Sequence, residues 1–552
     1  MVAIPRSSSY GFPVRLPRSN YTQIRFTPTD GFDDQADIQS SPGSISSGQN
    51  VWIWQGKLTP RPRLAQLGTS NPLADQPVGA FIYDDVGGAR YPVVASKGTI
   101  SYLNGTTWTP LTYVSGTSNR PLSGSVNDPI FGTSVYLPRL DTNLGAFTNG
   151  VDPVFVWGGP SNGTGFSTLA QSPICEDLTA TDTRLLFWNV RYLSTTSQLV
   201  TRVTWTVKGD PENSTGVGAG YQDLLDMRGA GTRCFARQEE VLLATDQEIW
   251  RGRSVGPPFD FQFEPLSRVI GMPSPRATIN TPDGLFWMGS DFMVYRLDPS
   301  FLGQIEAVGK TIQQTFHNSI ADLGSVFFGY HADSRQLSVY YTDSTGTAPQ
   351  RAMTLNTLTG TWTPQKFSHN LVTAFLGPQS TGSAVASGTT LWGQLVGTFA
   401  AQTLTYSQLG GGASSGAAAS NFAECLCSSG GTVFSMTHPS TQSTDDGIAV
   451  LHEATLGPLF VEPSDRRKYV DTIRLDVRAD TASTLSVALS PDLGQTFPSE
   501  QTIAVSVQSA TTQTVTRWGQ SGTYHTMRLR STGGTWEVNG ITVRARVEGE
   551  SF

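Results

Sequence analysis

The stretch YLNGTTWTPL at residues 102–111 is repeated almost literally as TLTGTWTPQ at residues 357–365. In both copies a glycine precedes a Thr-Trp-Thr-Pro segment. In the first copy this glycine belongs to an Asn-Gly pair, the dipeptide that favours a two-residue hairpin turn. Two copies of one hairpin, far apart in the chain, indicate a fold that repeats a unit of a few strands.

Hairpin signals of this kind recur between residues 49 and 400. Apolar and aromatic runs alternate with tight turns, with clear examples at 91–110, 184–211, 239–252, 283–298 and 326–341. A new hairpin begins roughly every 40 to 50 residues, which is the spacing of β-propeller blades. We therefore predict an all-β chain whose residues 49–400 form a β-propeller of six or seven blades.

The two tryptophans of the repeat, Trp108 and Trp362, are predicted to anchor this propeller. In a propeller each would wedge between adjacent blades and so help to close the blades into a ring. For either residue alone, an ordinary place in the core agrees equally well with the sequence. The shared context, Gly-Thr-(Thr)-Trp-Thr-Pro with the second Thr present only in the first copy, favours the position between blades.

The composition agrees with an all-β chain of more than one domain. The chain has 552 residues, of which 38% are hydrophobic, including 12 Trp, so a sizeable core is available and wholesale disorder is excluded. Charged residues make up only 15%, against roughly 25% in an average globular protein. Gly, Pro, Ser and Thr take their place, as expected for many short strands joined by tight turns.

Three segments flank the predicted propeller. Residues 1–48, rich in Pro, Arg, Ser and Asp, are predicted to be an extended N-terminal arm that is ordered only where it lies against another part. Residues 401–446 contain GGGASSGAAAS and are predicted to be a linker or loop. Residues 447–552 alternate strictly between apolar and polar residues, for example at 473–477 and 541–548, which predicts a C-terminal β-sandwich-like domain.

The stretch SPDLGQTF at residues 490–497 lies in this C-terminal segment and matches S-x-D-x-G-x-T-[WF], the Asp-box turn known from sialidase propellers. Asp492 is expected to accept hydrogen bonds from backbone N–H groups of its own loop, and Gly494 to adopt a positive φ. Ser490, Thr496 and Phe497 complete the motif, with the Phe497 ring placed to anchor the hairpin. One box outside the propeller predicts a structural turn.

Catalytic, metal and cofactor motifs find no support in the sequence. A sialidase would carry several Asp boxes, an arginine cluster and a Tyr–Glu nucleophile pair, whereas this chain has one complete box and scattered arginines. The six histidines form no H-E-x-x-H arrangement, and no P-loop is present. Cys425 and Cys427 lack a second ligand pair at zinc spacing, and the acidic stretch at 31–39 lacks calcium-loop spacing. The sequence therefore predicts a protein that is not an enzyme and binds neither metal nor cofactor.

The formal net charge of −7 is unevenly distributed. It amounts to +3 over residues 1–63, −1 over residues 447–552 and −9 over the middle of the chain. An acidic protein repels the phosphates of DNA, so the only contact with DNA that this charge favours is one in which DNA slides past the protein without binding to it. The N-terminus lacks the apolar region of a signal peptide, and no apolar run is long enough for a membrane span. We expect a soluble product, made inside the cell.

Several stretches in a fixed order resemble the tail nozzle, or packaged-DNA stabilisation (tail hub), proteins of short-tailed bacteriophages. Residues 202–226, RVTWTVKGDPENSTG…GYQDLLD, and residues 243–298 resemble parts of their propellers. QNVWIWQGKLTPRPRLAQLG at 49–68 is similar to the strand that leads into the propeller. RRKYVDTIRLDV, the Asp box and TRWGQSGTYHTMRLRS at 516–531 resemble the closing β domain. The chain departs from the pattern in its GGGASSGAAAS insertion and in a box that ends in Phe.

The resemblance implies a virion protein that forms a homohexameric ring below the portal and the adaptor protein, with the propellers pointing outward. Such a ring continues the channel for double-stranded DNA, retains the packaged genome and opens for ejection, and tail fibres or spikes dock on its flank. No cofactor is implied. The basic N-terminal arm is expected to bind a neighbouring subunit or the adaptor.

Two other functions remain open from the sequence. A receptor- or glycan-binding propeller would use exposed aromatic side chains on one face, and 12 Trp and 16 Tyr permit this. A virion depolymerase is the enzymatic alternative. Closed-ring assembly favours the nozzle, whereas sugar affinity of the isolated monomer favours the binding module.

Overall fold

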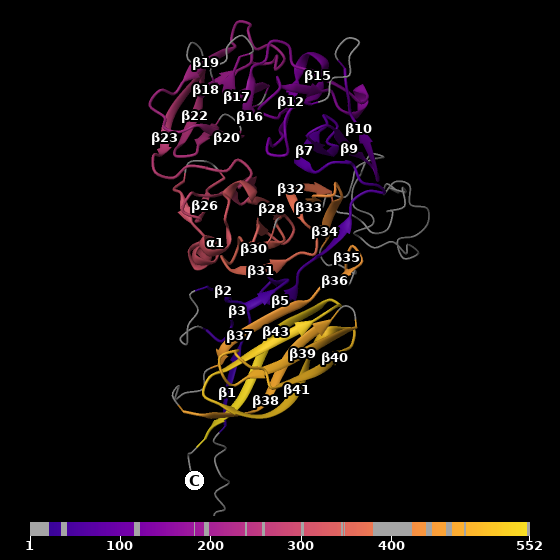
Figure 1. Ribbon diagram of the computed structural model, residues 1–552, viewed down its shortest axis with the longest axis vertical. Helices are drawn as coiled ribbons and strands as arrows, with labels where there is room; N and C mark the ends of the chain where they lie inside the picture. The colour runs from indigo at the N-terminus through magenta and orange to yellow at the C-terminus, as the bar shows by residue number, and fades with distance from the viewer. Residues whose placement is uncertain are drawn as a thin grey trace, which may run out of the picture.

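The computed structural model describes residues 21–34, 41–114, 122–181, 183–192, 198–237, 240–256, 260–299, 303–343, 346, 348–378, 422–437, 444–459, 466–479 and 482–548. They form a propeller and a sandwich, stacked along the long axis of the molecule (Figure 1). Strands dominate both bodies, and the single α-helix in the described ranges is α1 (Gln313–Ser319). None of the described helices is long and apolar enough to cross a membrane. The predicted all-β fold class is confirmed.

Within the described residues the propeller has seven blades, each an antiparallel sheet of four strands except for the five-stranded second blade. Blade 1 contains β7 (Pro77–Asp84), β8 (Arg90–Ser96), β9 (Ile100–Asn104) and β10 (Thr107–Pro110). Blade 2 contains β11 (Thr112–Tyr113), β12 (Phe131–Leu137), β13 (Thr142–Thr148), β14 (Phe155–Trp157) and β15 (Gly165–Thr168). In this blade β11 pairs in parallel with β15. Blade 3 contains β16 (Ile174–Thr181), β17 (Arg184–Arg191), β18 (Gln198–Trp205) and β19 (Gly220–Asp223).

The other four blades follow in chain order. Blade 4 contains β20 (Gly231–Arg237), β21 (Glu240–Thr245), β22 (Ile249–Gly256) and β23 (Asp260–Ser267). Blade 5 contains β24 (Thr278–Thr281), β25 (Gly284–Met288), β26 (Val294–Leu297) and β27 (Glu306–Ala307). Blade 6 contains β28 (Phe327–His331), β29 (Gln336–Tyr341), β30 (Arg351–Asn356) and β31 (Trp362–Lys366). Blade 7 contains β32 (Leu371–Pro378), β33 (Phe422–Ser428), β34 (Val433–Thr437) and, from the start of the chain, β6 (Arg63–Gln66). Short 3-10 turns lie in the connections: η1 (Pro138–Leu140), η2 (Pro160–Asn162), η3 (Lys310–Ile312) and η4 (Leu323–Ser325).

Blade 7 closes the ring by combining strands from two distant parts of the chain. β6 pairs antiparallel with β34, with Arg63 opposite Thr437 and Gln66 opposite Phe434. β32, at the inner end of blade 7, contacts β7 of blade 1. The predicted propeller end at residue 400 is therefore wrong, because β33 and β34, which lie inside the predicted linker 401–446, belong to the propeller. Its predicted start at residue 49 is also wrong, because residues 51–54 and 57–60 belong to a sheet of the sandwich. The Gly/Ala/Ser stretch at 410–420 lies outside the described residues.

In the part of the chain that the structure describes, the sandwich consists of two six-stranded sheets. One has the order β4 (Val51–Trp54), β5 (Lys57–Pro60), β43 (Trp536–Val547), β38 (Lys468–Ala479) and β41 (Gln508–Gly522), with β1 (Tyr21–Phe26) also paired to β43. The other has the order β2 (Gly31–Phe32), β3 (Ser44–Gln49), β37 (His452–Leu459), β42 (His525–Ser531), β39 (Ser483–Ser490) and β40 (Ser499–Val505). β35 (Thr444–Asp445) and β36 (Ile448–Ala449) form a small separate hairpin.

The two ends of the chain thus build one sandwich. The prediction of an extended N-terminal arm at 1–48 is wrong for the residues of that segment that the structure describes, because they include the sandwich strands β1, β2 and β3. Ile24 and Phe26 of β1 pack against the core, and the exposed Arg25 between them forms an ion pair with Asp476 of β38 at 3.2 Å. Residues 1–20 and 35–40 lie outside the described residues.

The predicted alternation explains the core of the sandwich. Ile473, Leu475 and Val477 are fully buried, whereas Arg474 between them is exposed. Facing strands contribute the same kinds of residue, among them Leu456, Leu529 and Val543, to one continuous cluster. Apolar side chains on one face of each sheet therefore fill the space between the sheets, and the predicted sandwich is confirmed.

The sandwich is joined tightly to blade 6 of the propeller through β4. The side chain of Trp52 is fully buried and belongs to the same apolar cluster as Phe327 and Tyr340 of the propeller. The side-chain amides of Gln336 and Asn356 both donate to the carbonyl oxygen of Ile53, at 3.0 and 2.8 Å. Apolar burial and paired backbone groups at the same place argue for a rigid junction.

Candidate functional site

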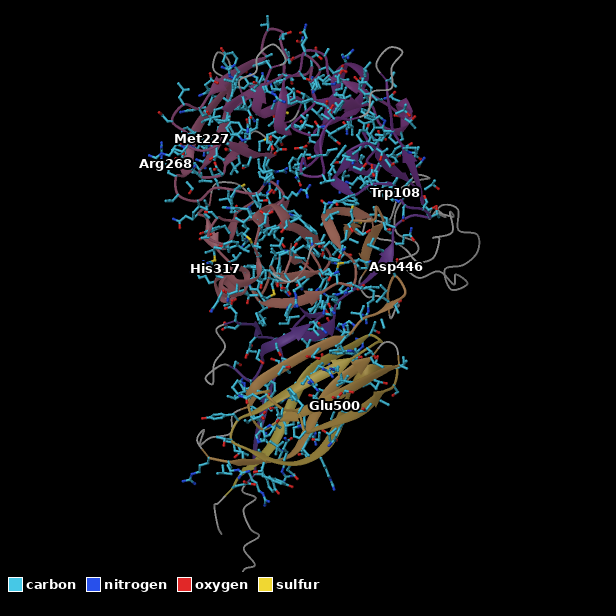
Figure 2. All side chains as sticks on the ribbon, in the orientation of Figure 1. Trp108, Met227, Arg268, His317, Asp446 and Glu500 are labelled. Atoms are coloured by element: carbon cyan, nitrogen blue, oxygen red, sulfur yellow. The ribbon has the colours of Figure 1, made fainter. Side chains whose placement is uncertain are left out.

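The tryptophans of the sequence repeat both lie between blades. Trp108 in β10 of blade 1 packs against blade 7, and its indole Nε1 donates to the Leu67 carbonyl at 2.9 Å. Trp362 in β31 of blade 6 packs against blade 5, and its Nε1 donates to the Val308 carbonyl at 3.0 Å. Figure 2 shows Trp108 on the outer side of the propeller. Each ring therefore joins the last strand of one blade to the segment that follows the last strand of the preceding blade.

The Asp box forms the turn between β39 and β40 of the sandwich. Asp492 accepts hydrogen bonds from the Thr496 backbone N–H at 2.9 Å and the Thr496 hydroxyl at 2.6 Å. The Ser490 hydroxyl donates to Asp492 at 2.6 Å and accepts from the Gly494 N–H at 2.8 Å. Gly494 adopts φ 85°, as the motif requires, and the preceding Leu493 also has a positive φ of 59°. These contacts lie within the motif itself, so the box serves as a turn.

The carboxylate of this turn is stabilised in its charged form. Hydrogen bonds from Ser490 and Thr496 lower the pKa of Asp492 to about 2. The ring of Phe497 lies under the guanidinium of Arg528, 4.1 Å away, on the neighbouring strand β42. The aromatic residue of the box therefore anchors the hairpin to the sheet.

A buried ionic cluster lies where the propeller meets the sandwich. The guanidinium of Arg61 and the carboxylate of Asp445 are both fully buried and form a two-pronged ion pair. Arg61 Nε also donates to Asn50 Oδ1 at 3.0 Å, and its guanidinium lies over the Phe367 ring at 4.4 Å. Asp445 accepts a further bond from the Leu64 N–H at 3.0 Å. The cluster links the segment before the propeller to the segment after it. Figure 2 shows Asp446, the next residue, at this level of the molecule.

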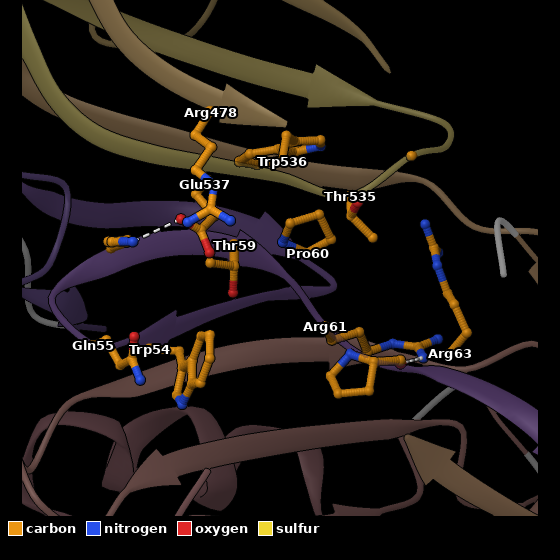
Figure 3. A pocket seen from close by; sticks show the side chains of 13 residues that line it. Trp54, Gln55, Thr59, Pro60, Arg61, Arg63, Arg478, Thr535, Trp536 and Glu537 are labelled. Carbon is orange, nitrogen blue, oxygen red and sulfur yellow. Dashed lines mark hydrogen bonds and ion pairs between the residues drawn. The ribbon is translucent and has the colours of Figure 1, made fainter. Parts of the chain in front are cut away.

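A cavity of about 220 Å³ opens beside this cluster, between β5 and β6 on one side and the β38 and β43 strands of the sandwich on the other (Figure 3). We call it the junction cavity. Its lining includes four cationic side chains and one carboxylate, Glu537, which is paired with Lys57 at 2.7 Å. Arg63 is 2% exposed, and burial together with the neighbouring Arg61 charge lowers its pKa to about 10. Neither Arg63 Nη1 nor Nη2 finds a hydrogen-bond acceptor in the described part of the chain.

A second hollow, of about 600 Å³, lies between the outer strands of blades 3 and 4. We call it the aromatic hollow, because Trp205, Tyr221, Phe261 and Phe263 line it. Tyr221 is 58% exposed, and the guanidinium of Arg202 lies over its ring at 4.0 Å. Trp205 is nearly buried, and its Nε1 has no acceptor among the described residues. Two amides, Gln222 and Gln262, complete a mixed aromatic and polar surface.

Two buried carboxyl groups lie between blades, away from both hollows. Asp177 of blade 3 accepts from the backbone N–H of Cys234 in blade 4 at 2.7 Å and pairs with Arg233 at 3.4 Å. Glu424 of blade 7 accepts from the hydroxyl of Tyr340 in blade 6 at 2.6 Å. Burial raises the pKa of Glu424 to about 8, so this carboxyl is protonated near neutral pH. Both groups connect neighbouring blades.

Metal-binding groups do not gather in the described part of the chain, where no set of three His, Cys, Asp or Glu side chains is placed to hold an ion. Cys425 and Cys427 are buried in β33, and burial raises the pKa of both thiols. The carboxylate that lines the aromatic hollow, Asp260, is paired with Arg184 at 3.0 Å. Glycoside hydrolysis generally uses two carboxyl groups across one sugar site, whereas each hollow contributes one, already paired, among its described lining residues.

Sequence reasoning missed the junction cluster. The stretch LTPRPRL at 58–64 places two arginines among apolar residues and prolines, which was the available signal. Asp445, the partner of Arg61, lies in the segment predicted to be a linker. No pattern in the sequence around either residue identifies them as a pair. Long-range partners of this kind leave no periodic pattern in either segment.

Comparisons with known proteins show a likeness in solved structures only. No family model matches the chain, and no curated protein matches it. The exo-β-1,3-galactanase of Phanerochaete chrysosporium is 10% identical, with 87% of this chain and 100% of that chain covered and a TM-score of 0.26. A family 43 arabinoxylan arabinofuranohydrolase of Bacillus subtilis is 9% identical, with 90% and 95% covered and a TM-score of 0.24. YCF48 bound to a D1 peptide is 13% identical, with 68% and 99% covered and a TM-score of 0.34.

These comparisons correct one prediction. The sequence-based statement that the chain is not an enzyme is contradicted, because two of the similar structures are glycoside hydrolases. At such low identity and TM-score the likeness carries no activity over to this chain. The fold alone therefore assigns no reaction to this chain.

Proposed function

We propose that the protein is a subunit of a bacteriophage tail nozzle, a ring below the portal and adaptor through which the packaged DNA is retained and then released. The observation that carries the proposal is the two-part architecture, in which both chain ends build one sandwich and the propeller is inserted between them. This arrangement agrees with the order of the stretches that resemble nozzle proteins, from residues 49–68 to residues 516–531. A subunit of this shape can pack through its sandwich while it presents its propeller outward.

The rigidity of the junction supports this arrangement. The fully buried Arg61–Asp445 pair and the contacts of Trp52 hold the propeller against the sandwich. A ring closes only when every subunit presents its interface at the same angle, and a fixed junction meets that requirement.

Surface charge supports a conduit for DNA. The chain is acidic overall, and many arginines on the described surface are already paired with carboxylates. Pairs of this kind include Arg202–Asp223, Arg253–Glu240, Arg351–Asp343 and Arg530–Glu453. Paired arginines offer little net attraction to phosphates, so DNA can pass such a surface without being retained by it.

The N-terminal segment is proposed to bind a neighbouring subunit or the adaptor. β1 begins at Tyr21, opposite Arg546, near the end of β43 that points away from the propeller (Figure 1). A deletion of residues 1–20 leaves β1 intact and is therefore the appropriate variant. We expect the deleted protein to keep its unfolding midpoint and to lose ring assembly. Unchanged assembly on the portal–adaptor complex would rule out this role for the arm.

The test of the nozzle itself is the native mass of the purified protein with and without its portal–adaptor complex, measured by light scattering. A complex that gains about six copies supports the proposal, as does a ring formed without the template. A monomer under both conditions contradicts it and favours the second candidate below.

The second candidate is a receptor- or glycan-binding propeller, and the aromatic hollow is the observation that favours it. Sugar rings stack on exposed aromatic faces, and amide side chains such as Gln222 and Gln262 bond to hydroxyl groups. The test is a glycan array with the wild type, Tyr221→Ala and, as a control in blade 2, Tyr136→Ala. Signal lost only with Tyr221→Ala supports the candidate, whereas no signal from the wild type contradicts it.

A further inference from the structure

The outer face of one sandwich sheet carries an excess of arginines. They project from four neighbouring strands, because β1 pairs with β43, β43 with β38, and β38 with β41. Each alternates along its strand with side chains of the core, as Arg474 does between the buried Ile473 and Leu475. We call this surface the arginine face. Its arginines are Arg25 in β1, Arg474 in β38, Arg517 in β41, and Arg544 and Arg546 in β43.

The strand register places these arginines on the same side of the sheet, because directly opposed residues share a face. The opposed sets are Arg544, Thr472 and Arg517 in one row and Arg25, Thr542 and Arg474 in the next. Arg546 lies two residues beyond Arg544 and therefore points the same way. Strand spacings of about 4.8 Å and two-residue steps of about 6.8 Å spread the five cations over roughly 14 Å in each direction.

The carboxylates among these arginines do not balance their charge. Asp471 pairs with Arg544 at 3.8 Å, and Asp476 pairs with Arg25 at 3.2 Å. The remaining three arginines are exposed and form no ion pair with a described residue; they are Arg474, Arg517 and Arg546. The arginine face therefore carries a local excess of positive charge.

Two of the guanidinium groups lie over tyrosine rings. Arg544 lies over the ring of Tyr21 at 4.1 Å, and Arg546 lies over the ring of Tyr469 at 4.7 Å. Contact with an aromatic face restricts a long arginine side chain but leaves its charge in place. These two cations are therefore positioned in advance for a further anionic partner.

The outer face of the other sandwich sheet has balanced charges among its described residues. There Arg530 pairs with Glu453 at 2.6 Å, and Arg528 pairs with Glu500 at 3.2 Å. The positive excess is thus confined to one face of a chain whose net charge is −7. The propeller is stacked on the other end of the sandwich (Figure 1). Because charges are screened over about 8 Å at physiological ionic strength, the acidic propeller has little influence on the potential at this face.

We propose that the arginine face binds the phosphate backbone of double-stranded DNA without sequence preference. Cations spread over roughly 14 Å require a ligand whose anionic groups extend over the same distance, and one small oxyanion is too short. Duplex DNA carries one negative charge for about every 1.7 Å of its axis. The two parallel N–H groups of a guanidinium also match two oxygens of one phosphate.

This inference deepens the proposed nozzle function by naming the surface that contacts DNA, and it rests on that proposal for the source of the DNA. The charge distribution itself belongs to the single chain. DNA binding by a protein that stays monomeric on its portal–adaptor complex would contradict the nozzle and support the arginine face. A ring that does not bind DNA would have the opposite meaning.

Fluorescence anisotropy of a labelled mixed-sequence duplex, titrated with the full chain at several salt concentrations, tests the proposal. We expect a dissociation constant of about 1 to 100 μM at physiological salt. The logarithm of the affinity is expected to fall with the logarithm of the salt concentration with a slope of about −3 to −4, as for three or four phosphate contacts. Absence of binding at about 50 mM salt would overturn the proposal. Polyglutamate that competes as well as unlabelled duplex at equal charge would assign the face to an acidic protein and would also overturn it.

Variants at exposed positions locate the contact. Arg474→Gln, Arg517→Gln and Arg546→Gln are each expected to weaken DNA binding by about 3- to 10-fold and to reduce the salt slope by about 1. The matched control is Arg530→Gln, which changes the net charge equally on the other sheet and is expected to stay within about 2-fold. If Arg546→Gln, which loses the contact with Tyr469, does not fold, the other two variants decide. Equal losses in the control and in the arginine-face variants would show that binding follows net charge alone and would overturn the proposal.

Discussion

Trp108 and Trp362 occupy equivalent positions in two different blades. Each lies in the last strand of its blade and donates its indole N–H to a backbone carbonyl just after the last strand of the preceding blade, Leu67 for one and Val308 for the other. For Trp108 the preceding blade is the seventh, which the N-terminal strand β6 completes. The repeat in the sequence therefore marks the contact that seals the ring as well as an ordinary contact between blades.

Replacing these tryptophans with phenylalanine tests their role. Trp108→Phe and Trp362→Phe remove the indole N–H, so the accepting carbonyl loses this donor, and each is expected to cost about 1 to 3 kcal/mol in the free energy of unfolding. Trp287→Phe is the matched control, because Trp287 is fully buried but its Nε1 has no acceptor in the described part of the chain. Urea unfolding measures all three. Equal losses for the three variants would show that the hydrogen bonds contribute nothing beyond ring volume.

The buried ion pair at the junction makes a second prediction. Asp445→Asn leaves the Arg61 guanidinium buried beside a neutral amide, and such losses typically cost about 3 to 5 kcal/mol. Glu548→Gln, which removes an exposed pair with Arg467, is expected to change stability by less than about 1 kcal/mol. The measurement is the free energy of unfolding in urea. Similar values for the two variants would contradict the role assigned to Arg61 and Asp445.

Glu424 predicts a stability that depends on pH near neutrality. Its pKa rises from 4.5 to about 8 on burial, with Tyr340, Ser338 and Arg61 as the neighbours that lower it. The folded state therefore binds the proton more tightly than the unfolded state, and this contribution to stability is lost as pH rises from about 4.5 through about 8.

Glu424→Gln removes this dependence because the amide does not ionise. The variant is expected to match the wild type at pH 5 and to exceed it by a few kcal/mol at pH 9, at about 1.4 kcal/mol for each pKa unit. Urea unfolding at pH 5, 7 and 9 measures the difference, with Glu500→Gln at an exposed pair as the control. A difference that stays constant with pH would disprove the assignment.

The Asp box predicts the opposite pH dependence of stability from that of Glu424, because the pKa of Asp492 is lowered in the folded state. Hydrogen bonds from Ser490 and Thr496 lower the pKa of Asp492 to about 2, so its contribution to stability is present above about pH 4 and is lost as pH falls through about 2. Asp492→Asn is expected to lower the thermal midpoint at pH 5 and to approach the wild type toward pH 2. Thermal scans at pH 5, 3 and 2 measure this. A gap that does not narrow on acidification would mean that the carboxylate charge is unimportant in the turn.

Local patterns explain what the sequence could predict. The hairpin spacing predicted the propeller, because each blade is built mostly from consecutive strands. Strict alternation predicted the sandwich, since Ile473, Leu475 and Val477 had to share one buried face. The Asp-box geometry followed from its own residues for the same reason.

Pairings between distant segments escaped prediction. Two strand pairs, β6 with β34 and β1 with β43, connect segments that are far apart in the sequence. Neither segment of a pair contains a local pattern that identifies its partner, so the predicted boundaries of the arm and the linker were wrong. β33 lies close behind a Gly/Ala/Ser-rich stretch, whose composition concealed the strand. The Arg61–Asp445 pair depends on the same distant closure, so the junction cavity was not predictable from the sequence.

The proposed nozzle requires that this chain build a closed ring around a DNA channel. The decisive measurement is negative-stain imaging of the purified protein, alone and after incubation with its portal–adaptor complex. We expect rings of six subunits with a central channel and with propellers projecting outward, formed alone or on the adaptor. Isolated two-lobed monomers under both conditions would contradict it.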